Sequence, residues 1–181
     1  MVVGVLALQG GFAAHARVLR RLGADVREVR VPDDLDGLDG LVIPGGESTT
    51  MTLGIDREAL AEPLRSFGKP IFGTCAGLIM LDRAHLGLMD IEARRNAFGR
   101  QVRSFEADLE FAGLEGPALR AVFIRAPWIA EHGEDVEILA EVDGHAVAAR
   151  QGSLLAVAFH PELGDDTRLH ERFLAACDGI R

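Results

Sequence analysis

The chain has 181 residues, 48% of them hydrophobic, which is enough to bury the core of one compact domain over residues 1–181. Acidic residues outnumber basic ones by 28 to 19, and the net charge of −9 argues against a nucleic-acid partner. No apolar run approaches the roughly 18 residues that span a bilayer, so we expect no membrane segment. With no signal peptide and only two cysteines, Cys75 and Cys177, we expect a cytoplasmic protein with both thiols reduced.

The first half of the sequence alternates short apolar runs with helical patterns. Runs that are apolar throughout suit strands buried on both faces of a parallel sheet. We expect strands at Val2–Leu8, Asp25–Val31, Leu41–Ile43 and Pro70–Phe72, and helices at Phe12–Leu22, around Arg57–Phe67 and over Ala76–Leu81. This alternation predicts an α/β fold with a mostly parallel, doubly wound, flavodoxin-like sheet flanked by helices.

The second half has a different pattern, with shorter β-like segments. The segments expected there are Ala121–Ile124, Val136–Val142, Ala146–Ala149 and the apolar strand Leu154–Phe159, followed by a closing helix at Thr167–Cys177. Ligands of such sheets bind beyond the carboxyl ends of the strands. The residues that follow each strand are therefore the first place to look for a site.

The fourth expected strand runs into Gly73-Thr74-Cys75-Ala76-Gly77, a G-x-C-x-G nucleophile elbow. A sharp strand-to-helix turn strains the central residue and needs small neighbours. Cys75 would stand at a helix N-terminus, where the dipole favours the thiolate, and the Ala76 N–H would point to a developing oxyanion. The alternative is a buried packing cysteine. The position between an apolar strand and an apolar helix argues against it.

The last expected strand is followed by His160-Pro161-Glu162. A nucleophilic cysteine needs a base, and the base needs a group that orients it. In an extended segment residues i and i+2 project to the same side, so Glu162 can hold one ring nitrogen of His160. The alternative is a turn with a solvated histidine and glutamate. Both motifs directly follow expected strands, and this shared position favours a common site over a chance occurrence of the two motifs.

The third expected strand is followed by Pro44-Gly45-Gly46-Glu47-Ser48-Thr49-Thr50. Two glycines allow a close approach of the backbone to a ligand, and N–H groups of such a loop can hold an anion. The same residues also suit a tight turn and a helix N-cap at Ser48 or Thr49. The remaining histidines have no partner at metal-ligand spacing and predict no metal site; they are interpreted as ordinary core or surface residues, and comprise His15, His85, His132, His145 and His170.

Several longer motifs resemble a known family. PGGESTTM at 44–51, GTCAGLI at 73–79, RNAFGRQVRSFE at 95–106, FIRAP at 123–127 and FHPEL at 159–163 are similar to the PdxT-type glutaminase subunits of pyridoxal 5′-phosphate synthase, within the class I (triad) glutamine amidotransferases. GTCAG and FHPE are shared by many class I glutaminases, whereas PGGESTT, RNAFGRQ and FIRAP are specific to this branch. The match extends over nearly the whole chain.

The resemblance implies site residues as well as a fold. It implies Cys75 as nucleophile with His160 and Glu162 completing the triad, and an oxyanion hole from the N–H groups of Ala76 and Gly46. It further implies that L-glutamine is contacted by Gly46, Glu47, Ser48, Arg95, Ile124 and Arg125. On the residues alone, Arg95 and Arg125 would be surface ion pairs of little energetic value. One departure is the short connection at Asp82-Arg83-Ala84-His85, where relatives carry a longer one.

The function expected from the resemblance is hydrolysis of L-glutamine to glutamate and ammonia, without a cofactor. The ammonia would pass to a separate PdxS-type synthase subunit, because only a closing helix follows the triad and leaves no room for an acceptor site. One alternative is a PfpI-type cysteine hydrolase or chaperone, which gives no reason for the His-x-Glu after the last strand. Another is a catalytically silent binding module on the same kind of sheet.

Overall fold

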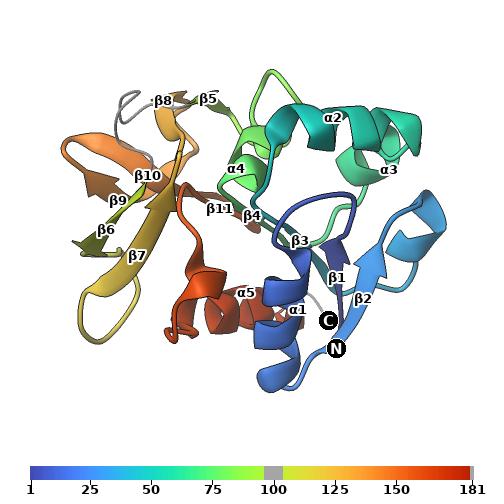
Figure 1. Cartoon of the computed structure of the whole chain (residues 1–181), viewed down its shortest axis with the longest axis horizontal. Helices are drawn as coiled ribbons and strands as arrows, with labels where there is room; N and C mark the ends of the chain where they lie inside the picture. The colour runs from blue at the N-terminus through green and yellow to red at the C-terminus, as the bar shows by residue number, and fades with distance from the viewer. Residues whose placement is uncertain (96–103, 180–181) are drawn as a thin grey trace.

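A computed structural model of the chain describes residues 1–95 and 104–179 and shows one central sheet between two layers of helices (Figure 1). The described part of the main sheet has nine strands, in the order β2-β1-β3-β4-β11-β10-β8-β5, with β9 paired to β10. Their bounds are β1 Val2–Leu6, β2 Asp25–Val29, β3 Gly40–Ile43, β4 Ile71–Thr74, β5 Ile91–Arg94, β8 Trp128–His132, β9 Glu137–Val142, β10 His145–Gln151 and β11 Leu154–Val157.

Five neighbouring strands, β2-β1-β3-β4-β11, run parallel, and β10, β8 and β5 extend the sheet in antiparallel fashion. A separate antiparallel pair joins β6, Ser104–Leu109, to β7, Leu119–Ile124. This confirms the predicted α/β class, a mostly parallel sheet with extra β-segments in the second half. The parallel strands bring the ends of β3, β4 and β11 to the same edge.

Helices cover both faces of the sheet. In Figure 1, α1 (Phe12–Arg21) and α5 (Arg168–Asp178) lie below the sheet, while α2 (Ser48–Arg57), α3 (Ala61–Arg65) and α4 (Ala76–Leu81) lie above it. All residues of β3 and β4 are buried, as their apolar sequences predict. Fully buried Phe72 packs its ring against Phe173 of α5, which fixes that helix under the centre of the sheet.

Several of the predicted element boundaries were wrong. The strands expected to reach Leu8, Val31 and Phe159 each end two residues earlier, and the helix expected around Arg57–Phe67 is replaced by α2 and α3. The break between them falls where Ala59 has a positive φ of 55°, which a continuous helix does not allow. The start of α2 is disguised by the run of hydroxyl residues after Glu47, although its buried Met51 and Ile55 have helical spacing.

The short connection after α4 is organised by the buried carboxylate of Asp82. Its Oδ1 accepts the backbone N–H groups of Ala84 and His85 at 2.9 and 3.0 Å and the ring Nδ1 of His85 at 2.7 Å. Its Oδ2 accepts the N–H of Ala93 at 3.3 Å, which ties the connection to β5. One carboxylate thus satisfies the backbone groups that a tight connection leaves without partners.

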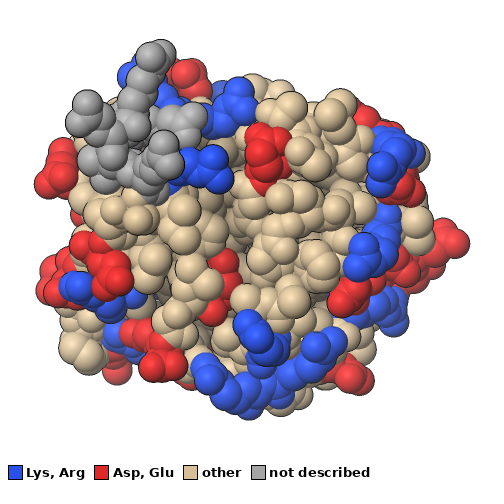
Figure 2. All heavy atoms as spheres, in the orientation of Figure 1, with Lys and Arg blue, Asp and Glu red and all other residues tan. Residues whose placement is uncertain are grey.

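Charged side chains are distributed unevenly over the face drawn in Figure 2. Basic side chains gather along its lower edge, over the end of α1, whose last turn carries Arg20 and Arg21. A broad uncharged area crosses the middle of the same face. The net negative charge therefore does not describe every surface of the molecule. No helix within the described ranges is long and apolar enough to cross a membrane.

The packing of α4 on β3 generates a stability prediction. A methyl group on Gly77 would overlap the carbonyl oxygen of Ile43, so Gly77→Ala must push helix and strand apart. We expect a loss of about 1–3 kcal/mol in the free energy of unfolding, the range for an overpacked core. Chemical denaturation followed by circular dichroism measures this loss.

The matched control is Gly54→Ala, another helical glycine. A methyl group there would lie 3.3 Å from the flexible end of Leu8, and alanine favours a helix over glycine by about 1 kcal/mol. We expect this variant to be as stable as the wild type or more stable. Equal stability of the two variants would contradict the close packing of α4 on β3.

Candidate active site

Cys75 stands alone between β4 and α4 in a strained backbone conformation, with φ 50° and ψ −105°. Its N–H donates to Val157 O on the neighbouring strand at 2.8 Å, which holds the turn against the sheet. The glycines on either side are needed for packing, because a Cβ on Gly73 would lie only 2.7 Å from Gly77 O. The predicted sharp elbow is therefore confirmed, and the thiol is presented at the carboxyl edge of the sheet.

His160 and Glu162 follow β11 and point toward the same turn. The Nδ1 of His160 lies 2.8 Å from Oε1 of Glu162, and the His160 N–H donates to Val122 O at 2.9 Å. The expected extended segment was wrong, because Pro161–Leu163 form a short 3-10 turn, η2. Proline fixes φ near the value that such a turn needs. The turn places the Glu162 carboxylate beside the His160 ring. The two side chains are therefore paired as predicted, although the backbone between them is a 3-10 turn and not extended.

Gly45 packs closely against both the His160 ring and Cys75. A methyl group on Gly45 would lie 2.5 Å from Cε1 of His160 and 3.2 Å from Cβ of Cys75. Only a residue without a side chain therefore lets the cysteine and the histidine face the same point. A substrate atom placed there would be within reach of both.

The charges of this group support one another. Burial lowers the pKa of His160, but the hydrogen bonds and negative charges of Cys75 and Glu162 outweigh it and raise that pKa from 6.5 to about 10. Burial likewise raises the pKa of Glu162, but His15 and His160 beside the carboxylate overcome this effect and hold it well below the ordinary value. At neutral pH His160 therefore carries a proton beside the ionised Glu162 and next to Cys75, which suits proton transfer to a leaving group.

The loop after β3 is held by a segment that the sequence analysis did not single out. The Gly45 carbonyl accepts the Gly11 N–H at 2.9 Å, and the Glu47 N–H donates to Gln9 Oε1 at 2.7 Å. Gly10 has a φ of 91°, and a Cβ there would overlap the Gly45 carbonyl. The signal available in the sequence was the glycine pair after the first apolar strand.

The N-cap of α2 is Glu47, so the expectation of Ser48 or Thr49 was wrong. The Glu47 carboxylate accepts the N–H groups of Thr49 and Thr50 at 3.1 and 2.7 Å. These bonds, with that of Thr50 the largest, lower the pKa of Glu47 to about 2. Ser48 lies one residue inside the helix and is buried. A longer acidic side chain thus takes the role usually given to a short hydroxyl.

A cavity of about 330 Å³ opens over these groups. It brings together all the residues that the resemblance assigned to glutamine or the oxyanion, together with two of the three triad members. The lining comprises Gln9, Gly46, Glu47, Ser48, Cys75, Ala76, Ile79, Arg95, Ile124, Arg125, Pro127 and His160. Glu162 stands behind His160, outside the cavity wall. The volume is that of a small-molecule site.

Two arginines reach the cavity from separate segments. Arg95 donates to the hydroxyls of Ser48 and Thr49 at 3.2 and 3.3 Å. Arg125 has a positive φ of 45°, and the carbonyl before it, of Ile124, lies 3.9 Å from the Cys75 sulfur. Neither arginine forms an ion pair within residues 1–95 and 104–179, so neither is the surface ion pair considered above. Most of the RNAFGRQVRSFE motif, at 96–103, lies outside the described residues.

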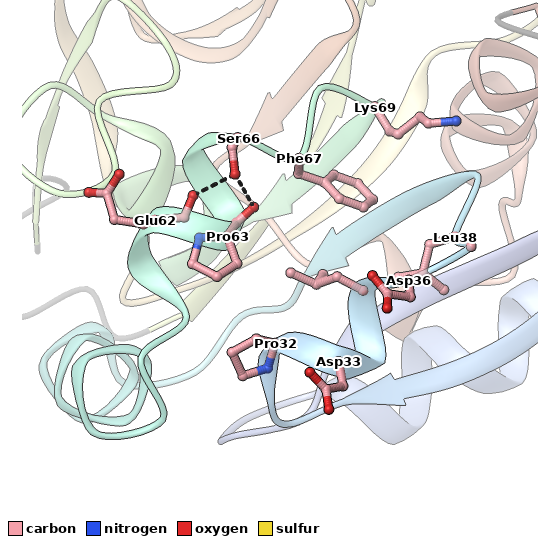
Figure 3. A pocket seen from close by; sticks show the side chains of 11 residues that line it. Pro32, Asp33, Asp36, Leu38, Glu62, Pro63, Ser66, Phe67 and Lys69 are labelled. Carbon is pink, nitrogen blue, oxygen red and sulfur yellow. Dashed lines mark hydrogen bonds between the residues drawn. The ribbon is translucent and has the colours of Figure 1, made fainter.

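A second cavity, of about 630 Å³, lies between segments 32–38 and 62–69 (Figure 3). Proline, aspartate and leucine side chains line it with Phe67 and Lys69, and its lining includes no cysteine or histidine. The Ser66 hydroxyl there donates to the carbonyls of Glu62 and Pro63 and so serves the local turn. Chemistry is concentrated at the first cavity. No cluster of three or more histidine, cysteine or acidic side chains suited to a metal occurs in the described part of the chain.

Comparison with known proteins agrees with this geometry. The model of the SNO glutamine amidotransferase family matches residues 5–179. A pyridoxal 5′-phosphate synthase subunit PdxT of Geobacillus kaustophilus is 54% identical, over 96% of this chain and 93% of its own. The corresponding subunit of Rhodococcus opacus is 50% identical over 99% and 98% of the two chains.

Solved structures give the same answer. A glutamine amidotransferase crystal structure superposes with a TM-score of 0.92 at 45% identity, covering 98% of this chain and all of the other. The glutaminase domain of Trypanosoma brucei CTPS, solved with bound acivicin, shares the fold with a TM-score of 0.66 at 18% identity, covering 98% and 93% of the two chains. With a family model matched over nearly its whole length, the chain belongs to the SNO glutamine amidotransferase family.

Proposed function

We propose that this chain, as one amidotransferase domain, hydrolyses L-glutamine to L-glutamate and ammonia and delivers the ammonia to a synthase subunit that makes pyridoxal 5′-phosphate. The observation that carries the hydrolytic part is the close packing of Cys75 and His160 against Gly45, with Glu162 2.8 Å behind the ring. A silent binding module would have no use for this pairing. A cysteine hydrolase of another superfamily is disfavoured by the family match over residues 5–179.

The reaction proceeds in two halves. The Cys75 thiolate attacks the amide carbon of glutamine, and the oxyanion is held by the Ala76 N–H and a backbone N–H at Gly46. His160 gives its proton to the departing nitrogen, so the C–N bond breaks and a thioester remains. His160 then takes a proton from water, which attacks the thioester and releases glutamate as the C–S bond breaks. Each oxyanion donor contributes on the order of 10²–10³ in rate.

Glutamine is bound by the cavity wall around the thiol. Arg95 and Arg125 supply the positive charge that an α-carboxylate needs, and Ile124 lies against the substrate chain beside Cys75. Glu47 fixes the positions of Gly46 and Ser48 through its cap on α2. A rise in the KM for glutamine without loss of stability is the signature expected of Arg95→Ala.

The partner is a PdxS-type synthase subunit. The relatives in Geobacillus and Rhodococcus are named as subunits of pyridoxal 5′-phosphate synthase, which supports an acceptor site on another chain. The switch is the peptide joining Gly45 and Gly46, whose carbonyl is held by the Gly11 N–H at 2.9 Å. A flip of this peptide exchanges that bond for another, so a docked partner can favour one orientation. The reaction takes place in the cytoplasm, where both cysteines stay reduced.

The nucleophile is tested by a pair of cysteine variants. Cys75→Ala should abolish ammonia release, whereas Cys177→Ala should retain it, because Cys177 lies buried in α5, remote from the cavity lining. Ammonia is measured by coupled assay at saturating glutamine in the synthase complex, with circular dichroism confirming that both variants fold. Equal loss of activity in two folded variants would remove Cys75 from the mechanism.

Alkylation distinguishes the same two thiols without turnover. Burial, followed by the charge of Asp39, raises the pKa of Cys177 to about 12, so only ~10⁻⁴ of it is ionised at pH 8. Iodoacetamide should therefore label Cys75 selectively, and His160→Asn should slow this labelling because the imidazolium beside the thiolate is lost. Peptide mass mapping over time gives both rates. Faster labelling of Cys177 would contradict the assignment.

Dependence on the synthase subunit is measured by adding it. The purified chain alone should release ammonia slowly, and the rate should rise at least tenfold with the partner, since the partner stabilises the active orientation of the Gly45–Gly46 peptide. The control is Cys75→Ala with the same partner, which excludes ammonia from any other source. Full activity of the isolated chain, unchanged by the partner, would indicate a free-standing glutaminase.

A further inference from the structure

The proposed hydrolysis leaves one polar side chain beside the triad without a role, that of His15 on α1. His15 is fully buried, although imidazole is usually hydrated. Its Nε2 lies 3.2 Å from Oε2 of Glu162 and 3.1 Å from the hydroxyl of Thr74, the residue before Cys75. Its Nδ1 lies 3.0 Å from Nε2 of His170, on α5, the helix beside α1 below the sheet (Figure 1). The triad thus has a polar layer behind it.

The second oxygen of Glu162 depends on this layer. Oε1 is used by His160, while Oε2 is buried and receives no well-aligned hydrogen bond from the residues that the structure describes. His15 Nε2 is the nitrogen that lies within reach of Oε2, at 3.2 Å. A buried carboxylate oxygen needs a donor or a positive charge, so loss of His15 would leave Oε2 without either.

The proton positions of the layer follow from its chemistry. Glu162 is ionised and can only accept, so His15 must carry its proton on Nε2. Nδ1 of His15 then accepts from Nε2–H of His170. Burial, the largest cause, lowers the pKa of His170 to about 3, so His170 is neutral and has one proton to give. Its Nδ1 is left as a lone pair with no hydrogen-bond partner among residues 1–95 and 104–179, which is less costly than an unpaired N–H.

We infer that His15 is a positioning residue of the glutaminase, which fixes the second oxygen of Glu162 and so holds the carboxylate against His160 while His160 gives and takes its proton. The inference rests on the proposed triad. The other explanation is that His15 only fills the core between α1 and the sheet. The two differ in whether the effect of His15 is transmitted through Glu162.

The ionisable groups around Glu162 define what a change at His15 should do. His160 faces it from η2 with Cys75 beyond, and His15 faces it from α1 with His170 of α5 behind. Arg21, also on α1, acts on His170 through space. Without His15 the anion of Glu162 is less favoured, which weakens its support for the His160 imidazolium. The alkaline limb of the rate profile should then move to lower pH and the acidic limb to higher pH.

Three variants separate position from packing. Glutamine at position 15 can place its amide nitrogen where histidine places Nε2, whereas asparagine reaches only as far as Nδ1. Leucine removes both the donor and the acceptor. We therefore compare His15→Gln, His15→Asn and His15→Leu. The pair His15→Gln and His15→Asn keeps a buried amide in both proteins, so the comparison survives if His15→Leu does not fold.

The experiment measures kcat/KM for glutamine against pH in the complex with the synthase subunit. His15→Asn and His15→Leu should lose roughly 10- to 100-fold, as for other residues that orient a catalytic group through a hydrogen bond. Their pH profiles should narrow by about one pH unit on the alkaline side. His15→Gln should recover most of the lost kcat/KM and most of the width of the profile. In a Glu162→Gln background the same changes should alter the rate by less than about twofold, because the effect passes through Glu162.

A wild-type profile in His15→Asn, or an effect as large in the Glu162→Gln background as in the wild type, would overturn the inference and leave His15 as a core residue. If the wild-type complex itself released no ammonia, the proposed function would fail instead. The inference would then be decided by proton NMR of the His160 Nδ1–H, whose downfield resonance reports the bond to Glu162. This resonance should move upfield in His15→Asn and stay in place in His15→Gln; no movement in either variant would count against it.

Discussion

The left-handed backbone of Cys75 is the constraint on which the rest of the site depends. A non-glycine residue in such a conformation costs about 1–3 kcal/mol, so the surrounding packing must hold it there. The chain does this with glycines at 73 and 77, which bring β4, α4 and the Ile43 carbonyl into direct contact. The N–H of Cys75 donates a hydrogen bond to the carbonyl of Val157 on the neighbouring strand. The strain thus places the thiol outside the sheet edge, where a substrate can reach it.

The second requirement is that three charged or ionisable groups coexist in a buried place. A buried imidazolium is stable there only while its carboxylate partner keeps its orientation, because a misplaced partner leaves a buried charge uncompensated. Glu162 lies in the 3-10 turn at Pro161–Leu163, directly after His160, so this turn orients the carboxylate toward the ring. The polar layer of His15, Thr74 and His170 then surrounds the carboxylate on its other side. A site of this kind extends well behind the atoms that meet the substrate.

Much of this was predictable from the sequence, for a definite reason. Apolar strands followed at once by G-x-C-x-G and His-Pro-Glu have local signatures, and parallel pairing of β4 with β11 brings the two motifs together. The role of Gln9-Gly10-Gly11, the cap by Glu47 and the position of His15 were not predicted. The first and the last depend on contacts between segments far apart in sequence, such as His15 with Glu162. The cap is local, to Thr49 and Thr50, but it uses a longer acidic side chain in place of the usual short one. A single histidine on an apolar helix face carries no sign of which carboxylate it will meet.

The parts of the site differ in how firmly the fold holds them, and this difference explains how its activity can be controlled. Cys75 and His160 follow neighbouring strands whose register runs from Ile71 with Leu154 to Thr74 with Val157, so their relative position is fixed by the sheet. The Gly45–Gly46 peptide follows β3 but is fastened at its carbonyl by a single hydrogen bond from Gly11. Under the proposed function, a partner that acts on this loop completes or withdraws an oxyanion donor without moving Cys75 or His160. In this arrangement control acts on the loop glycines, whereas the paired strands β4 and β11 fix the positions of Cys75 and His160.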